Sequence, residues 1–93
     1  MVLAETLGTF FFVGVILATA GTNILAPFAI GLALTIAIYF TNGASLGALN
    51  PAVTIALFAR GQLKVPEMVV YIVSQLVGAL LAVMWWKTTL GRH

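Results

Sequence analysis

The chain carries very few side chains that could perform acid–base or metal chemistry. Its 93 residues include two glutamates, one histidine, and neither aspartate nor cysteine. The lack of cysteine excludes disulfides, thiolate metal sites and a cysteine nucleophile. Two acids and one terminal histidine are too few for a catalytic constellation or a metal site built by the protein. We therefore expect no catalytic residue, no metal and no cofactor, and we assign no role to His93.

The triplet Asn50-Pro51-Ala52 is the most informative polar feature. Asn is a strong helix N-cap and Pro is favoured at the first helical position, so the triplet predicts a helix over residues 51–59. Nine helical residues extend roughly 14 Å, about half of a hydrocarbon core of roughly 30 Å. The start of such a helix presents unpaired N–H donors and a partial positive charge. Placed inside a membrane, it indicates a pore or a binding device.

The amino-acid composition indicates whether the chain lies in water or in a lipid bilayer. Hydrophobic residues make up 62% of the chain and charged residues 6%, with a mean hydropathy of +1.17. A soluble domain has about 25% charged residues. The chain is therefore predicted to be an integral, multi-pass membrane protein in a lipid bilayer. Its net charge of +2 is small and scattered, which argues against a nucleic-acid partner.

Three apolar runs predict the elements that hold the triplet. We expect helices over about residues 3–20, 25–41 and 66–86, with Trp85 and Trp86 as an interfacial anchor. Residues 42–60 are expected to form a re-entrant loop and half-helix. The predicted fold class is an all-α membrane protein, a single domain over 1–93 with three transmembrane helices plus one re-entrant half-helix. Non-helical backbone at membrane depth must be enclosed by protein or face water, so this chain needs partners.

Small residues and charges give two weaker indications of how the helices assemble. Rows of small residues at a spacing of four predict close helix packing. With three spans, two cations lie on each side of the membrane, so the positive-inside rule gives almost no preferred orientation. Insertion in both orientations is one interpretation, and an orientation set by a missing tail or a partner is the other. The small-residue rows are Gly14/Ala18, Ala29/Ala33/Ala37 and Gly78/Ala82.

Four sequence blocks, at residues 4–11, 29–32, 50–54 and 71–79, occur in an order and spacing that resemble a known family. They are similar to the aquaporin and glycerol-channel superfamily, the major intrinsic proteins. The resemblance implies a pore built from two repeats inverted in the membrane, each with three helices and a half-helix. This chain has one repeat, and it resembles the first half because Val53 stands where the second half usually has Arg. The implied architecture is a half-length channel paired with an antiparallel copy, or a truncated or split form.

The resemblance also implies roles for individual residues. Asn50 would hold an amide donor toward the pore, although it could serve only as a helix cap. Pro51 and Ala52 would pack the two half-helices together. Glu5 would be a buried carboxylate accepting hydrogen bonds from backbone N–H groups of the re-entrant loop; the alternative is an interfacial acid. Gln75 could do similar work or simply bond between helices, and Tyr71 is expected to serve packing or an interface rather than the pore.

The family's narrow filter maps onto four positions here. These are Ile30, Ile38 of the partner copy, Gly47 and Val53. The usual Arg is absent, and Leu46 and Ala48 replace a usual Gly and His in the loop. Such a ring offers few hydrogen bonds, so we expect small, less polar neutral solutes, or a slow water path, rather than strict water selectivity.

Three functional interpretations remain open from the sequence. The leading one is a passive channel for water or small neutral solutes such as glycerol, formed by a homo-oligomer of antiparallel pairs or a tetramer of such pairs. The second is a dual-topology, proton-coupled exporter, for which Glu5 is the available intramembrane acid. The third is a non-conducting structural or accessory membrane subunit.

Overall fold

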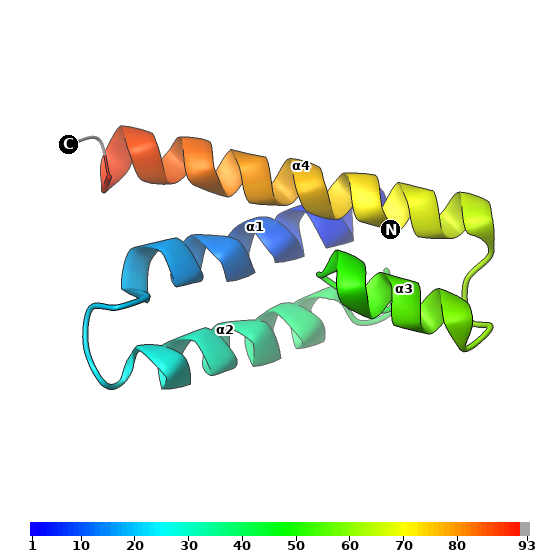
Figure 1. Ribbon diagram of the computed structural model, residues 1–93, viewed down its shortest axis with the longest axis horizontal. Coiled ribbons are helices and arrows are strands. Elements are labelled where there is room, and N and C mark those ends of the chain that lie inside the picture. Colours follow the sequence, from blue (N-terminus) through cyan, green and yellow to red (C-terminus); the bar gives the residue numbers. More distant parts are fainter. Residues whose placement is uncertain (92–93) are drawn as a thin grey trace.

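The computed structural model describes residues 1–91, and His93 and Arg92 lie outside this range. Over the described range the chain forms helices and no strand. The helices follow one another in the order α1 (Val2–Thr19), α2 (Ala26–Thr41), α3 (Pro51–Ala59) and α4 (Val65–Thr89). The molecule measures 42 × 24 × 20 Å, with the long axis running along the helices (Figure 1). The fold is therefore all-α, as predicted.

Local sequence signals explain where the helices begin. The Asn23 side chain accepts a hydrogen bond from the Leu25 N–H at 2.7 Å just before α2, and a proline follows within its first turn. The Glu67 carboxylate accepts from the Lys64 N–H at 2.8 Å and so caps α4. At its other end α4 continues to Thr89, past the predicted limit at residue 86. The polar residues after Trp86 mark the edge of the apolar run, and the helix extends beyond it.

The three long helices lie side by side with α1 in the middle. It packs against α4 on one side and α2 on the other (Figure 1). The short helix α3 packs against α4 and occupies one end of the molecule, starting near the middle of the long axis (Figure 1). The non-helical segment 42–50 joins α2 to that starting point. The short helix α3 thus begins near the middle of the molecule's long axis (Figure 1).

Small residues allow α4 to approach α1 closely. A Cβ added to Gly78 would collide with the backbone carbonyl of Thr6 and lie 3.1 Å from the backbone nitrogen of Phe10. Ala82, one turn further along α4, is completely buried. On α2, Ala33 and Ala37 are buried as well. These four small residues of α2 and α4 therefore serve packing within this chain.

The distribution of polar and apolar side chains is the reverse of that in a water-soluble protein. The largest fully buried side chains are polar ones, whereas large apolar side chains are exposed along the three long helices. Helices α1 and α4 are long and apolar enough to cross a membrane, and α2 is a shorter apolar helix of 16 residues. A surface of this kind suits a lipid environment. The buried polar side chains are Gln75, Glu5, Thr41 and Thr54.

Candidate functional site: a re-entrant loop held by buried polar groups

The segment before α3 has a backbone shape that few residues adopt readily. Gly43 and Gly47 have φ values of +86° and +66°, and Leu49 has a φ of +55°. Glycine adopts such values at little cost, whereas a non-glycine residue there is uncommon and carries strain. Leu49 is also almost completely buried. Its conformation must therefore be held by the groups around it.

Glu5 of α1 supplies the main support for this segment. The carboxylate accepts hydrogen bonds from the Leu49 N–H at 3.0 Å and from the Ser45 hydroxyl at 2.6 Å. It also accepts one from the Gln75 side-chain amide at 2.9 Å. Glu5 has no solvent-accessible surface, so these three donors replace the water that the carboxylate would otherwise bind. The acid joins α1, α4 and both ends of the loop.

Gln75 of α4 extends this network to the half-helix. Its amide nitrogen donates to the Thr54 hydroxyl at 2.7 Å as well as to Glu5. The Thr54 hydroxyl in turn donates to the Asn50 carbonyl at 3.0 Å, and the Thr54 N–H donates to the same oxygen at 2.9 Å. The first turn of α3 is therefore connected through buried side chains to the middle of α4.

Two further contacts hold the loop. The Thr9 hydroxyl lies 3.5 Å from the Leu49 carbonyl, and the Tyr71 hydroxyl accepts from the Leu46 N–H at 3.1 Å. Tyr71 also lies in a buried cluster with Ala48 and belongs to α4. Sequence reasoning assigned Tyr71 to packing or to an interface rather than to the pore. An aromatic side chain in an apolar helix gives no signal for a hydrogen bond to a loop 25 residues away.

The triplet itself lies at the uncovered end of α3. The Asn50 side-chain oxygen accepts from the Ala52 N–H at 2.7 Å, and Pro51 occupies the first helical position. Asn50 and Ala52 are exposed and Pro51 is half-buried. The side-chain oxygen of Asn50 thus caps the helix, and its amide nitrogen donates to no acceptor among residues 1–91.

The loop also presents backbone acceptors that the described part of the chain leaves open. Within residues 1–91, no donor reaches the carbonyl oxygens of Leu46, Gly47 or Ala48. Polar backbone groups at membrane depth must meet water or another protein segment. These three carbonyls, together with the Asn50 amide, give the site both acceptors and a donor.

The positions assigned to the filter do not all meet within one chain. Gly47 lies against Ile38, because an added Cβ would be 3.5 Å from the Ile38 Cγ2 atom. Ile30 is on the same helix but eight residues earlier, about 12 Å along its axis. Val53, in the first turn of α3, is exposed. A single chain therefore brings Gly47 close to Ile38 and leaves Ile30 apart from both.

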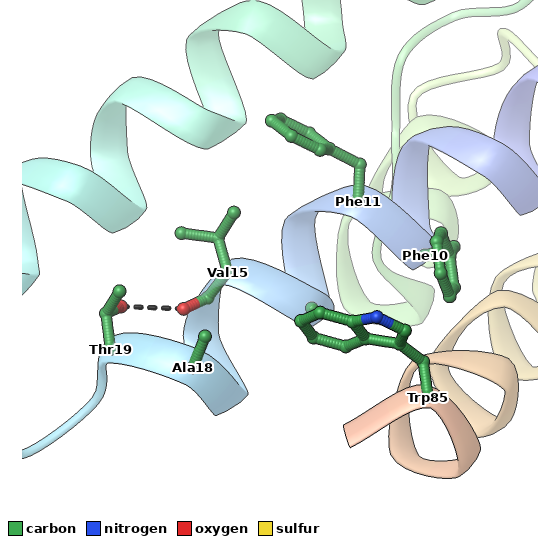
Figure 2. A pocket seen from close by; sticks show the side chains of 7 residues that line it. Phe10, Phe11, Val15, Ala18, Thr19 and Trp85 are labelled. Atoms are coloured by element: carbon green, nitrogen blue, oxygen red, sulfur yellow. Dashed lines mark hydrogen bonds between the residues drawn. The ribbon is translucent and has the colours of Figure 1, made fainter. Parts of the chain in front are cut away.

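Two apolar cavities lie along α1, away from the polar network. Each has a volume of about 380 Å³, and both are bordered by Phe10 and Phe11. Figure 2 shows the one between α1 and α4, where Trp85 faces Phe10 edge-on with ring centroids 6.5 Å apart. The Thr19 hydroxyl in this cavity already donates to the Val15 carbonyl at 2.6 Å (Figure 2). The linings are almost wholly apolar, so neither cavity resembles a path for a polar solute.

No group of three or more metal-binding side chains occurs in residues 1–91. Glu5 and Glu67 lie in different helices, and Glu67 caps α4. The chemistry that the described residues offer is hydrogen bonding by a loop and a helix start.

Comparison with known proteins places this geometry in a family. The family model described as major intrinsic protein matches residues 1–92. The chain belongs to this family. Its all-α fold and its position as an integral membrane protein follow from that membership and from the two apolar helices of spanning length.

Several curated members of the major intrinsic protein family are similar to this chain. Glycerol uptake facilitator protein-like 6 of Lactiplantibacillus plantarum is 38% identical over 84 residues, covering 86% of this chain and 39% of the relative. Aquaporin Z of Photorhabdus laumondii is 39% identical over 89 residues, covering 85% and 38%. Aquaporin-4 of Milnesium tardigradum is 35% identical over 89 residues, covering 86% and 26%. No solved structure matches the chain significantly. The chain thus spans well under half the length of these relatives.

Proposed function

We propose that this chain forms a passive channel for water and small neutral solutes, with a pore completed by a second, antiparallel copy. The observation that carries the proposal is the open donor and acceptor set at mid-depth: the Asn50 amide and the carbonyls of residues 46–48. A neutral hydroxylic solute both donates and accepts hydrogen bonds, so it matches such a set. Membership in a family of channels supports the same function.

In this proposal a second copy completes the pore, because residues 1–91 supply one half-helix. Helix α3 packs on α4 alone, and the exposed start at Asn50 has no protein across from it in residues 1–91. The relatives are more than twice as long as the matched region, which is consistent with a pore that needs two repeats. Two opposed half-helices would also place two positive helix ends at the centre, where they disfavour cations and protons.

The composition of the proposed constriction favours less polar solutes. In the paired arrangement, Ile30 of one copy and Ile38 of its partner would meet the loop positions Gly47 and Val53. The contact between Gly47 and Ile38 within one chain supports grouping these two on the same side of the pore. A ring without Arg or His offers few hydrogen-bond donors. We therefore expect glycerol-sized neutral solutes to pass along with water.

Stopped-flow swelling and shrinking of proteoliposomes tests the proposed function. We expect faster water and glycerol flux than in empty vesicles, with no ion conductance. Fast water flux with complete exclusion of glycerol would contradict the selectivity. Failure of every solute to permeate would instead indicate a non-conducting accessory subunit.

The paired arrangement has a separate test, which the lack of native cysteine makes simple. Gln62→Cys places one thiol in the exposed connection between α3 and α4. Antiparallel pairs predict that a membrane-impermeant maleimide labels about half of the thiols in native-membrane vesicles of one sidedness. Complete labelling, or none, would indicate a single orientation and would contradict the antiparallel pair.

The buried position of Glu5 argues against the exporter alternative. A proton-coupling acid must exchange its proton with water, whereas Glu5 is enclosed and bonded to three donors. The exporter predicts that a pH gradient drives solute flux in the wild-type chain, whereas Glu5→Gln lowers flux under either interpretation. Flux that follows the solute gradient alone would favour the channel.

A further inference from the structure

Tyr71 makes a contact that its position in an apolar helix does not require. Its side chain is 6% exposed and lies against Ala48 and Leu63, which would suffice for a purely apolar packing role. Its hydroxyl nevertheless accepts the Leu46 N–H at 3.1 Å. Leu46 directly precedes Gly47, a position assigned to the constriction.

Three backbone N–H groups beside Gly47 donate to side-chain oxygens rather than to the backbone carbonyls of a helix or a sheet. The Leu46 N–H donates to Tyr71, the Gly47 N–H to the Ser45 hydroxyl at 3.1 Å, and the Leu49 N–H to Glu5. An N–H and the preceding carbonyl belong to one planar peptide, so fixing the N–H fixes the direction of that carbonyl. Side-chain acceptors therefore determine which way the loop's peptide groups face.

Tyr71 is the acceptor that reaches the central part of the loop from α4. Glu5 holds the two flanks, at Ser45 and Leu49, and makes no hydrogen bond to Leu46 or Gly47. Without the Tyr71 oxygen, no other acceptor in residues 1–91 receives the Leu46 N–H. The peptide before Leu46 would then lose its own hydrogen bond and could tilt between its held neighbours, and the half-exposed Leu46 side chain would move with it.

We propose that Tyr71 is a positioning residue for the pore: its hydroxyl fixes the Ser45–Leu46 peptide beside Gly47 and thereby sets the ratio of glycerol to water flux. The proposal rests on the proposed channel function. In this role Tyr71 acts through the loop and does not contact the solute. The loop would keep its overall path in the absence of the hydroxyl, because Glu5 still holds both flanks.

The test uses Tyr71→Phe in the full chain, with Tyr39→Phe as the matched control. Tyr39 lies on α2, is 78% exposed, and its hydroxyl makes no hydrogen bond within residues 1–91. For Tyr71→Phe we expect the glycerol-to-water flux ratio to change by about threefold, as the loss of one hydrogen bond would allow. Tyr39→Phe should leave that ratio unchanged. A Tyr71→Phe channel that conducts with the wild-type ratio would overturn the positioning role alone, whereas a wild-type chain that conducts nothing would overturn the channel function as well.

Amide hydrogen exchange gives a readout that does not depend on the flux assay. In the wild type, the Leu46 amide should be protected, and Tyr71→Phe should speed its exchange about three- to tenfold. The Ala44 amide, which donates to the Thr41 carbonyl at 3.0 Å, should keep its rate and serves as the internal control. An unprotected Leu46 amide in the wild type would overturn the proposal even if the variant failed to fold.

Discussion

The Glu5 carboxylate binds residues that lie 40 to 70 positions further along the sequence than Glu5 itself. Its three hydrogen bonds reach Ser45, Leu49 and Gln75. A carboxylate accepts several hydrogen bonds and donates none, so it matches a site where every neighbour is a donor. A neutral side chain of the same size would not. Glu5 is therefore the residue at which the loop is most easily disrupted.

Glu5→Gln tests this dependence directly. The amide replaces one acceptor oxygen by an NH2 group that faces existing donors, so we expect a loss of about 3 kcal/mol in stability. Solute flux should fall with it, because Leu49 and Ser45 lose their support. Thermal unfolding in detergent measures the first effect and stopped-flow assays the second.

The chain's other acid provides the control for this variant. Glu67→Gln changes an exposed residue whose side-chain oxygen caps α4, and glutamine serves in a capping box as glutamate does. We expect little change in stability or flux. Equal effects of the two substitutions would show that loss of charge, rather than loss of the buried network, is responsible.

Asn50 allows the capping role and the pore role to be separated. Asp caps helices about as well as Asn, so Asn50→Asp should preserve α3 and the hydrogen bond to the Ala52 N–H. It replaces the open amide donor by a carboxylate, which costs a few kcal/mol at membrane depth and should reduce water flux about tenfold or more. Circular dichroism and stopped-flow assays measure the two properties. Unchanged flux would mean that Asn50 is only a cap.

At the scale of the helices, the contact between α1 and α4 depends on Gly78. Gly78→Ala would force the helices apart, because the new Cβ meets backbone atoms of Thr6 and Phe10 that cannot turn aside. We expect a destabilisation of about 2–3 kcal/mol. Gly31→Ala is the matched control, since nothing lies within 4 Å of a Cβ at that helical position. Thermal unfolding of both variants measures the difference, and equal stability of the two would contradict close packing at Gly78.

The helical elements could be predicted because their signals are local. Apolar runs indicated the three long helices, and Asn50-Pro51 indicated a short helix over residues 51–59, where the structure has α3. The all-α class predicted from these signals is confirmed. The end of α4 differed, because hydropathy reports where an apolar run stops and the backbone hydrogen bonds continue to Thr89.

The connections between elements could not be predicted from local signals. The path from Gln75 through Thr54 to Asn50 joins residues far apart in sequence, and no periodicity encodes it. The left-handed backbone of Leu49 was equally hidden, because glycine and not leucine signals that conformation. The expectation for Glu5 came from a family resemblance, and the residue types alone left an interfacial acid open.

At the scale of the whole molecule, three long helices lie side by side, and the short helix α3 packs against one of them, α4 (Figure 1). Helix α3 fills one end of the molecule, and the described chain places no second half-helix at the other (Figure 1). An antiparallel copy would bring its own α3 from the opposite side of the membrane. This requires that one sequence insert in two orientations, which the balance of two cations on each side permits.

Charge substitutions that fix the orientation test this requirement. Gln62→Lys with Lys87→Gln leaves three cations on the side of the α3–α4 connection and one on the other, whereas Arg60→Gln with Thr88→Lys produces the reverse. The positive-inside rule then inserts each double variant in one orientation, opposite to the other. We expect each to lose flux when expressed alone and to regain it when the two are expressed together, as measured by stopped-flow assays on membrane vesicles. Undiminished flux from either variant alone would show that copies in one orientation are enough, and would contradict a pore formed by antiparallel pairs.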